Sequence, residues 1–225
     1  MNRLVMGFHL LLALCASTIV CAQERHEYAP IEERTIDYAD WTFKSLRDGS
    51  PINFRTFTQG KRLVLVVYFA PWCPNWRYEA PILQRLYEKY HAHGLEIIAI
   101  SEYGALDETR RFFGDRGSPY PVVIESETRE ARDKTTHYAY RQRSGDKRNW
   151  GSPYNVFIEP AKVPSQGDIL AEKAWVANGE LIEDEAERFI RAKLGLEPSS
   201  APTTSERRNA DDHCAIELNA PAKKP

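Results

Sequence analysis

The stretch VVYFAPWCPNWRYEAP, Val66 to Pro81, decides the fold. It completes a valine-rich apolar run from Leu63 to Phe69, which predicts a central strand covered by helices on both faces. Cys73 follows this run, and Pro74 suits the first turn of a helix because no backbone N–H is needed there. Apolar residues then recur at helical spacing as far as Gly94, a residue type that commonly ends helices.

Cys73 occupies a position where a thiol becomes reactive. The first N–H groups of a helix have no partner within it, and the helix dipole is positive at this end. Both effects favour the thiolate, which is the nucleophilic form of cysteine. Trp72 is expected to form a flat apolar wall beside the sulfur. Trp76 stands where a second cysteine would complete a dithiol pair.

The remaining pattern predicts an α/β fold. Asp48-Gly49 favours a tight turn between two short runs, and hence a β-hairpin ahead of the central strand. Alternating strands and helices then predict one mixed sheet with helices on both faces. The later elements expected are strands at 95–100 and 121–124, helices at 107–116 and 129–140, two strands over YNVFIE and AEKAWVA, and a closing helix at 183–194.

Length, composition and charge narrow the function. With 225 residues and 42% apolar content, the chain is long enough for one well-buried domain with extra segments. Its 30 basic and 32 acidic residues give no indication of a nucleic-acid binder or a polybasic membrane surface. Together with Cys73, this near-equality of basic and acidic residues predicts that the partner is either a protein or a small thiol or disulfide. No cofactor is expected.

The first residues predict export. Arg3 precedes an apolar stretch from Leu4 to Val20, and the residues up to Ala22 fit a signal-peptidase site. We therefore interpret residues 1–22 as a signal peptide cleaved after Ala22, and the mature protein as periplasmic or extracellular. A retained membrane anchor and a lipoprotein signal at Cys21 are the alternatives. Membrane contact is expected only if the segment is retained.

Changes of composition divide the rest of the chain. We interpret residues 23–39 as a polar leader, 40–196 as the folded domain, and 197–225, rich in Pro, Ser, Thr and Ala, as a disordered tail. Removal of the signal peptide would leave Cys73 and Cys214 as the cysteines of the mature chain. In an oxidising compartment these two can pair or react with other proteins. Cys214 is therefore a possible resolving cysteine, with an incidental tail thiol as the alternative.

The segment LVLVVYFAPWCPNWRYEAP resembles the active-site region of the thioredoxin superfamily. It is most similar to exported thioredoxin-like proteins of the TlpA/ResA type, with domains of the AhpC/TSA and redoxin class. The Asp48-Gly49 hairpin, LYEKYHAHGLEIIAIS, YPVVIE and GSPYNVFIE follow in the order of that family. The resemblance covers residues 40–196 and implies a thioredoxin fold, with a mixed central sheet and an N-terminal β-hairpin extension.

The resemblance also implies roles for single residues. Cys73 matches the attacking cysteine of the family, and Pro153 matches the cis-proline that faces it. The backbone of Ser152 would then pair with an extended substrate segment. Glu79 matches an acidic residue that tunes the reactivity of the cysteine. The substrate-binding set implied in this way is Trp72, Pro74, Trp76, Ser152 and Pro153.

Trp76 departs from the family pattern and leaves the function open. In a dithiol enzyme the second cysteine attacks the mixed disulfide, which tryptophan cannot do. One hypothesis is a monothiol thiol-disulfide oxidoreductase of cell redox homeostasis, resolved by an external thiol or by Cys214. The alternative is a non-catalytic thioredoxin-like binding module. A one-cysteine peroxiredoxin-like antioxidant is disfavoured because Val66 and Ala70 stand where that class has a proline and a hydroxyl residue.

Two polar segments remain outside these hypotheses. The run RQRSGDKR, Arg141 to Arg148, carries four basic residues and one aspartate, and predicts a solvated insertion loop, with an acidic partner as the alternative. Near Cys214, two acids and one histidine are too few to predict a metal site.

Overall fold

The computed structural model describes residues 26–197, and strand β5 (Leu63–Phe69) forms the middle of its sheet. Every residue of β5 is fully buried, because both of its faces are covered. The strand pairs in parallel with β6 (Leu95–Ser101) and antiparallel with β8 (Tyr154–Ile158). The predicted central strand is confirmed.

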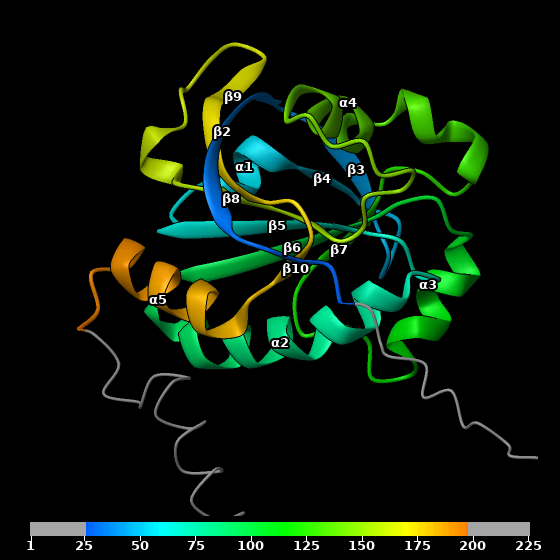
Figure 1. Cartoon of the computed structure of the whole chain (residues 1–225), viewed down its shortest axis with the longest axis horizontal. Helices are drawn as coiled ribbons and strands as arrows, with labels where there is room; N and C mark the ends of the chain where they lie inside the picture. The colour runs from blue at the N-terminus through cyan, green and yellow to red at the C-terminus, as the bar shows by residue number, and fades with distance from the viewer. Residues whose placement is uncertain (1–25, 198–225) are drawn as a thin grey trace, which may run out of the picture.

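The described chain forms a mixed sheet with the order β2-β9-β8-β5-β6-β7-β3-β4 (Figure 1). β5, β6 and β7 (Val122–Ile124) are parallel to one another, and the other neighbours in this sheet are antiparallel. β3 (Thr42–Ser45) and β4 (Pro51–Asn53) form the predicted hairpin. Its turn contains Gly49 at φ +74°, a conformation that glycine adopts without strain.

Helices cover both faces of this sheet (Figure 1). α2 (Pro74–Tyr90) and α5 (Glu183–Lys193) lie on one side, and α1 (Phe54–Thr58) and α4 (Thr136–Arg143) on the other. Alternate residues of β5 enter two separate cores, with Leu65 and Val67 in the first and Val64 and Val66 in the second. The predicted α/β fold with helices on both faces is therefore confirmed.

Smaller elements complete the described chain. β1 (Tyr28–Ala29) and β10 (Glu180–Leu181) form a two-stranded parallel sheet, and β9 (Ile169–Ala177) lies between β8 and β2. The 3-10 helices span His91–His93, Arg129–Lys134 and Pro160–Lys162, and α3 covers Leu106–Phe113. None of the helices within 26–197 has the length and apolar character needed to cross a bilayer. The predicted signal peptide, residues 1–22, lies outside the described residues, as does the predicted tail from 198 onward.

Two predicted boundaries differ from the structure. The segment interpreted as a polar leader contains β2 (Ile31–Ala39), which pairs with β9 and buries Ile36 and Tyr38 completely. The charged residues before them hid this strand, because they are exposed along its first half. The helix predicted at 129–140 is interrupted at Thr135, whose extended backbone and side chain instead cap the N-terminus of α4.

Candidate active site

Cys73 lies between β5 and α2. Its backbone is extended (φ −73°, ψ 126°), and it caps the N-terminus of α2, with Pro74 in the first turn. The Cys73 N–H donates to the carbonyl of Ala70 at 3.0 Å, which holds the tight turn between strand and helix. Cys73 is 8% exposed, and its thiol is free. A narrow accessible edge of the residue therefore lies beside the unpaired N–H groups of a helix terminus.

A cis peptide bond lies next to this cysteine. The Ser152–Pro153 bond is cis, and the Ser152 carbonyl oxygen accepts a hydrogen bond from the Cys73 Sγ at 3.3 Å. The Ser152 hydroxyl accepts from the Ala70 N–H at 2.9 Å. These two hydrogen bonds join the loop before β8 to the loop before α2. The structure thus brings Cys73 together with Ser152 and Pro153.

Trp76 lies in the core. Its side chain is fully buried and stacks on Phe69, with ring centroids 4.2 Å apart, and the tilted ring of Phe112 lies 5.4 Å away. The indole Nε1 has no hydrogen-bond partner in the described part of the chain. Trp76 was predicted to belong to the substrate-binding set, but its fully buried side chain offers no surface to a substrate. The third residue after Cys73 falls on the core-facing side of α2, and its indole is part of the apolar core.

Glu79 is also buried on α2. Its Oε2 accepts from the Leu181 N–H at 2.8 Å and from the Asn155 Nδ2 at 3.2 Å. Its Oε1 has no hydrogen-bond partner among residues 26–197. Burial raises the pKa of Glu79 to about 8, although the two hydrogen bonds act in the opposite direction. The carboxyl group is therefore mostly protonated at pH 7.

A buried polar chain joins Trp72 to the cis loop. The Trp72 Nε1 donates to the Tyr103 carbonyl at 2.9 Å, and the Tyr103 hydroxyl lies 3.0 Å from the His137 Nδ1. The His137 Nε2 lies 3.2 Å from the carbonyl oxygen of Gly151. Because a carbonyl only accepts, Nε2 carries the hydrogen and Nδ1 accepts from tyrosine. Burial, and then the nearby Arg141, lower the pKa of His137 well below its usual range, so the ring is neutral.

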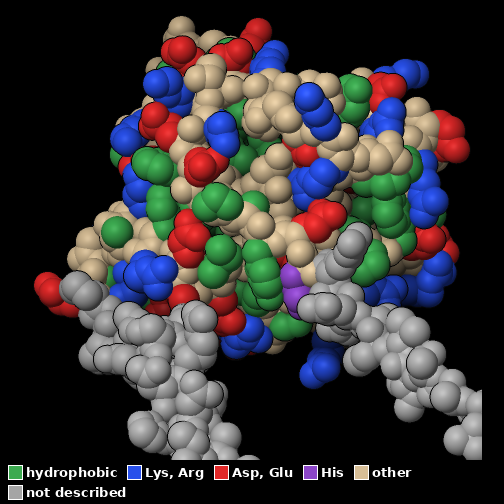
Figure 2. Space-filling model, in the orientation of Figure 1, with side chains coloured by type: hydrophobic (Ala, Val, Ile, Leu, Met, Phe, Trp, Pro, Cys, Tyr) green, Lys and Arg blue, Asp and Glu red, His purple; other side chains and the backbone are tan. Residues whose placement is uncertain are grey.

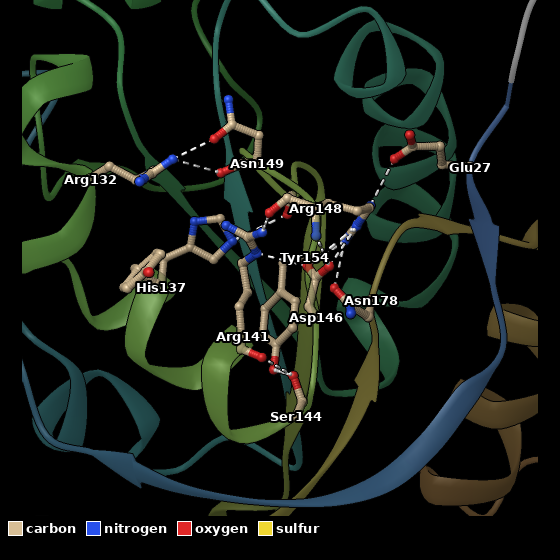
Figure 3. Close-up of polar contacts among 12 residues, drawn as sticks. Glu27, Arg132, His137, Arg141, Ser144, Asp146, Arg148, Asn149, Tyr154 and Asn178 are labelled. Carbon is tan, nitrogen blue, oxygen red and sulfur yellow. Dashed lines mark hydrogen bonds and ion pairs between the residues drawn. The ribbon is translucent and has the colours of Figure 1, made fainter.

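A buried ion pair lies beneath the same loop (Figure 3). The Arg141 Nε donates to the Asp146 Oδ2 at 2.7 Å, and both side chains are almost fully buried. Arg148 binds the same carboxylate and also contacts Glu27 and Asn178. Burial alone would raise the pKa of Asp146, but the hydrogen bonds from Arg148 and Arg141 outweigh it and lower this pKa to about 2.

Gly151 packs directly on this ion pair. Its φ is +59°, and a Cβ at this position would overlap the Arg141 guanidinium and lie 2.6 Å from the Asp146 Oδ2. The prediction of a solvated loop for the run from Arg141 to Arg148 is therefore wrong at Arg141. That side chain is buried because Asp146 compensates its charge.

The other predicted site residues are placed as follows. Trp72 is half-buried beside Cys73, Pro74 is exposed at the start of α2, and Cys214 lies outside the described residues. Tyr103 and His137 were missed by sequence reasoning, because they belong to no motif and lie far from Cys73 in the chain. Asn155, which contacts Glu79, could have been found from the sequence, because it is an amide residue within the mostly apolar and fully buried strand β8.

Comparison with known proteins supports this architecture. The profile of the AhpC/TSA family matches residues 37–161, more than half of the 225-residue chain. The chain therefore belongs to the AhpC/TSA family. A search of curated proteins finds no match.

Several solved structures are similar to this chain. A thiol:disulfide interchange protein of the thioredoxin family from Chlorobium tepidum TLS is 20% identical with a TM-score of 0.50, covering 72% of this chain and 98% of its own. A secreted disulfide oxidoreductase from Mycobacterium tuberculosis is 17% identical with a TM-score of 0.49, covering 68% and 95%. A secreted thiol-disulfide isomerase from Corynebacterium glutamicum is 18% identical with a TM-score of 0.49, covering 70% and 85%. The Chlorobium tepidum TLS structure supports the assignment of the thioredoxin fold to this chain.

Proposed function

We propose that this protein is an exported monothiol thiol-disulfide oxidoreductase that uses Cys73. The observation that carries the proposal is the 3.3 Å hydrogen bond between the Cys73 Sγ and the Ser152 carbonyl, which lies in a cis-proline loop. A nucleophile at a helix N-terminus beside a free backbone edge has the parts needed to attack a disulfide and hold its chain. The names of the structural relatives agree with this chemistry.

The proposed reaction has two exchange steps. The Cys73 thiolate attacks a substrate disulfide, forming a Cys73–substrate disulfide and releasing one substrate thiolate. An external thiolate then attacks the substrate sulfur of the mixed disulfide, which restores the Cys73 thiolate and leaves the substrate joined to that thiol. If Cys214 resolves the adduct, it attacks the Cys73 sulfur instead, which releases the second substrate thiolate and leaves a Cys73–Cys214 disulfide for two equivalents of an external thiol to reduce. Each step breaks one S–S bond and forms another. Glu79, whose raised pKa keeps it mostly protonated at pH 7, is the proposed proton carrier for these steps.

Trapping the mixed disulfide tests this function. The full mature chain is treated with a small disulfide, and intact mass spectrometry follows the adduct and its loss when a second thiol is added. We expect the Cys214→Ser chain to form one adduct that disappears on thiol addition and is absent from the chain that carries both Cys73→Ser and Cys214→Ser. Comparison with the native chain reports on resolution by Cys214. A native chain whose Cys73 forms no adduct, although the denatured chain does, would contradict the proposal.

A binding module is the second candidate, and the low exposure of the site favours it. Cys73 is 8% exposed and Ser152 is 3% exposed, so little of either residue is open to an incoming disulfide. Under this alternative, Cys73→Ser would leave partner capture unchanged. Under the proposed function, the same substitution abolishes covalent capture.

A further inference from the structure

A cavity adjoins the Cys73 loop. Its volume is about 490 Å³, and it is lined by Pro71, Trp72, Arg77, Glu108, Arg111 and Phe112. Two of these residues immediately precede Cys73, and the Arg77 N–H donates to the Cys73 carbonyl from the first turn of α2. The cavity is therefore built on the same short segment as the thiol, at a place where part of a bound substrate can rest.

The positive charge of this cavity is available to a ligand. The Arg77 guanidinium has no ion pair or hydrogen bond with any residue of the described range. Arg111 pairs with Asp107, but the Arg111 side chain is 67% exposed, and such exposed pairs contribute little. The Glu108 Oε2 already accepts from the Ala105 N–H at 3.0 Å, so this carboxylate is engaged at the start of α3.

More arginines surround the cavity. The Arg129 guanidinium lies 4.3 Å from the centre of the Trp72 ring. Arg111 also lines a neighbouring cavity of about 970 Å³, together with Arg47, Arg110 and Arg116. Figure 2 shows Lys and Arg side chains along the edge of the molecule around α3. Asp48 and Asp115 also line that neighbouring cavity, so four arginines stand against two carboxylates there.

We propose that this cavity binds a carboxylate of the substrate, so that Cys73 reacts preferentially with anionic disulfides, and the resulting Cys73 adduct with anionic thiols. The proposal rests on the function proposed above and specifies its substrate class. Arg77 and Arg111 supply guanidinium groups, whose paired donors suit a carboxylate, while Trp72 and Phe112 offer apolar surface to the carbon chain between that carboxylate and the sulfur. The arginines neither gain nor lose electrons or protons in the reaction. They orient the substrate while the two sulfur exchanges proceed as described above.

Disulfides of matched size and different charge test this proposal. The full mature chain is treated in turn with dithiodipropionate, which is anionic, hydroxyethyl disulfide, which is neutral, and cystamine, which is cationic. The rate of Cys73 adduct formation with each reagent is measured by mass spectrometry. It is divided by the rate at which the same reagent reacts with a small uncharged model thiol. We expect the anionic reagent to exceed the cationic one by about tenfold at low ionic strength, with the ratio falling as salt is added.

Matched variants locate the effect. Arg77→Gln and Arg111→Gln should each lower the ratio about threefold, the size expected for one exposed charge pair. Arg110→Gln is the control, because Arg110 is the neighbour of Arg111 on α3 but lines only the other cavity. Equal normalised rates for the three reagents, or an equal effect of Arg110→Gln, would overturn the proposed subsite. Absence of adduct with all three reagents would instead contradict the proposed function.

Discussion

The Cys73 Sγ donates a hydrogen bond to the carbonyl oxygen of Ser152 at 3.3 Å. When Cys73 forms a disulfide it loses the proton that makes this bond, and the carbonyl then becomes free to accept from a substrate N–H. The loop that carries this carbonyl is supported by His137 and rests on the buried pair of Arg141 and Asp146. Changes in this support should therefore alter the chemistry of Cys73 without touching its sulfur.

Gly151→Ala tests the support of the loop. The added Cβ would overlap the Arg141 guanidinium at a backbone conformation that L-residues rarely adopt, so we expect a loss of about 3 kcal/mol in unfolding free energy. Adduct formation at Cys73 should slow in the same variant. Urea denaturation and the adduct rate measure the two effects. Gly117→Ala is the control, because Gly117 also has a positive φ but nothing lies within 4 Å of its added Cβ. Equal losses in the two variants would show that backbone conformation alone is responsible.

His137→Gln tests the neutral buried imidazole. Burial lowers the pKa of His137 in the folded protein, whereas in the unfolded chain the ring takes up a proton below about pH 6.5. The unfolded state therefore binds more protons, and this group makes the protein less stable as pH falls below about 6.5. The variant should lose that part of the acid dependence. Unfolding free energies measured between pH 7 and pH 5 decide the matter, and an unchanged slope would argue against a neutral buried ring.

The strand, the cysteine and the helix after it were predictable because their signals are local. Seven consecutive buried residues in β5 and a proline one residue after Cys73 are visible in a short window of sequence. The support of the cis loop was not predictable, because His137 contacts Gly151 only after the chain has folded. The burial of Arg141 was not predictable for a related reason. A charged residue is usually exposed, and only the contact with Asp146 makes its burial possible.

Glu79→Gln tests the buried carboxyl group. Burial raises the pKa of Glu79 to about 8, so between about pH 4.5 and pH 8 the folded state holds a proton that the unfolded state has released. The stability that this group contributes is present below pH 4.5 and is lost as pH rises through 8. We expect the unfolding free energy of the variant to fall less as pH increases. The difference should be about 1.4 kcal/mol for each pKa unit by which the folded and unfolded states of the native protein differ. Denaturation at pH 5 and pH 8.5 gives the comparison, and parallel curves for the two proteins would refute the shift.

Trp76→Cys tests whether the site accepts the missing second thiol. Because Trp76 is fully buried and stacks on Phe69, we expect the reduced variant to lose about 3 kcal/mol through the cavity left behind. If the backbone at the start of α2 places the two sulfurs within bonding reach, the variant should also gain turnover in reduction of a protein disulfide.

Trp76→Phe is the matched control for this change. It keeps an aromatic ring on Phe69 and adds no thiol, so it should lose less stability and gain no turnover. Chemical denaturation and a disulfide-reduction assay separate the two effects, because the cavity affects only the first. A folded Trp76→Cys protein that turns over no faster than the Trp76→Phe protein would show that more than the second cysteine separates this site from a dithiol enzyme.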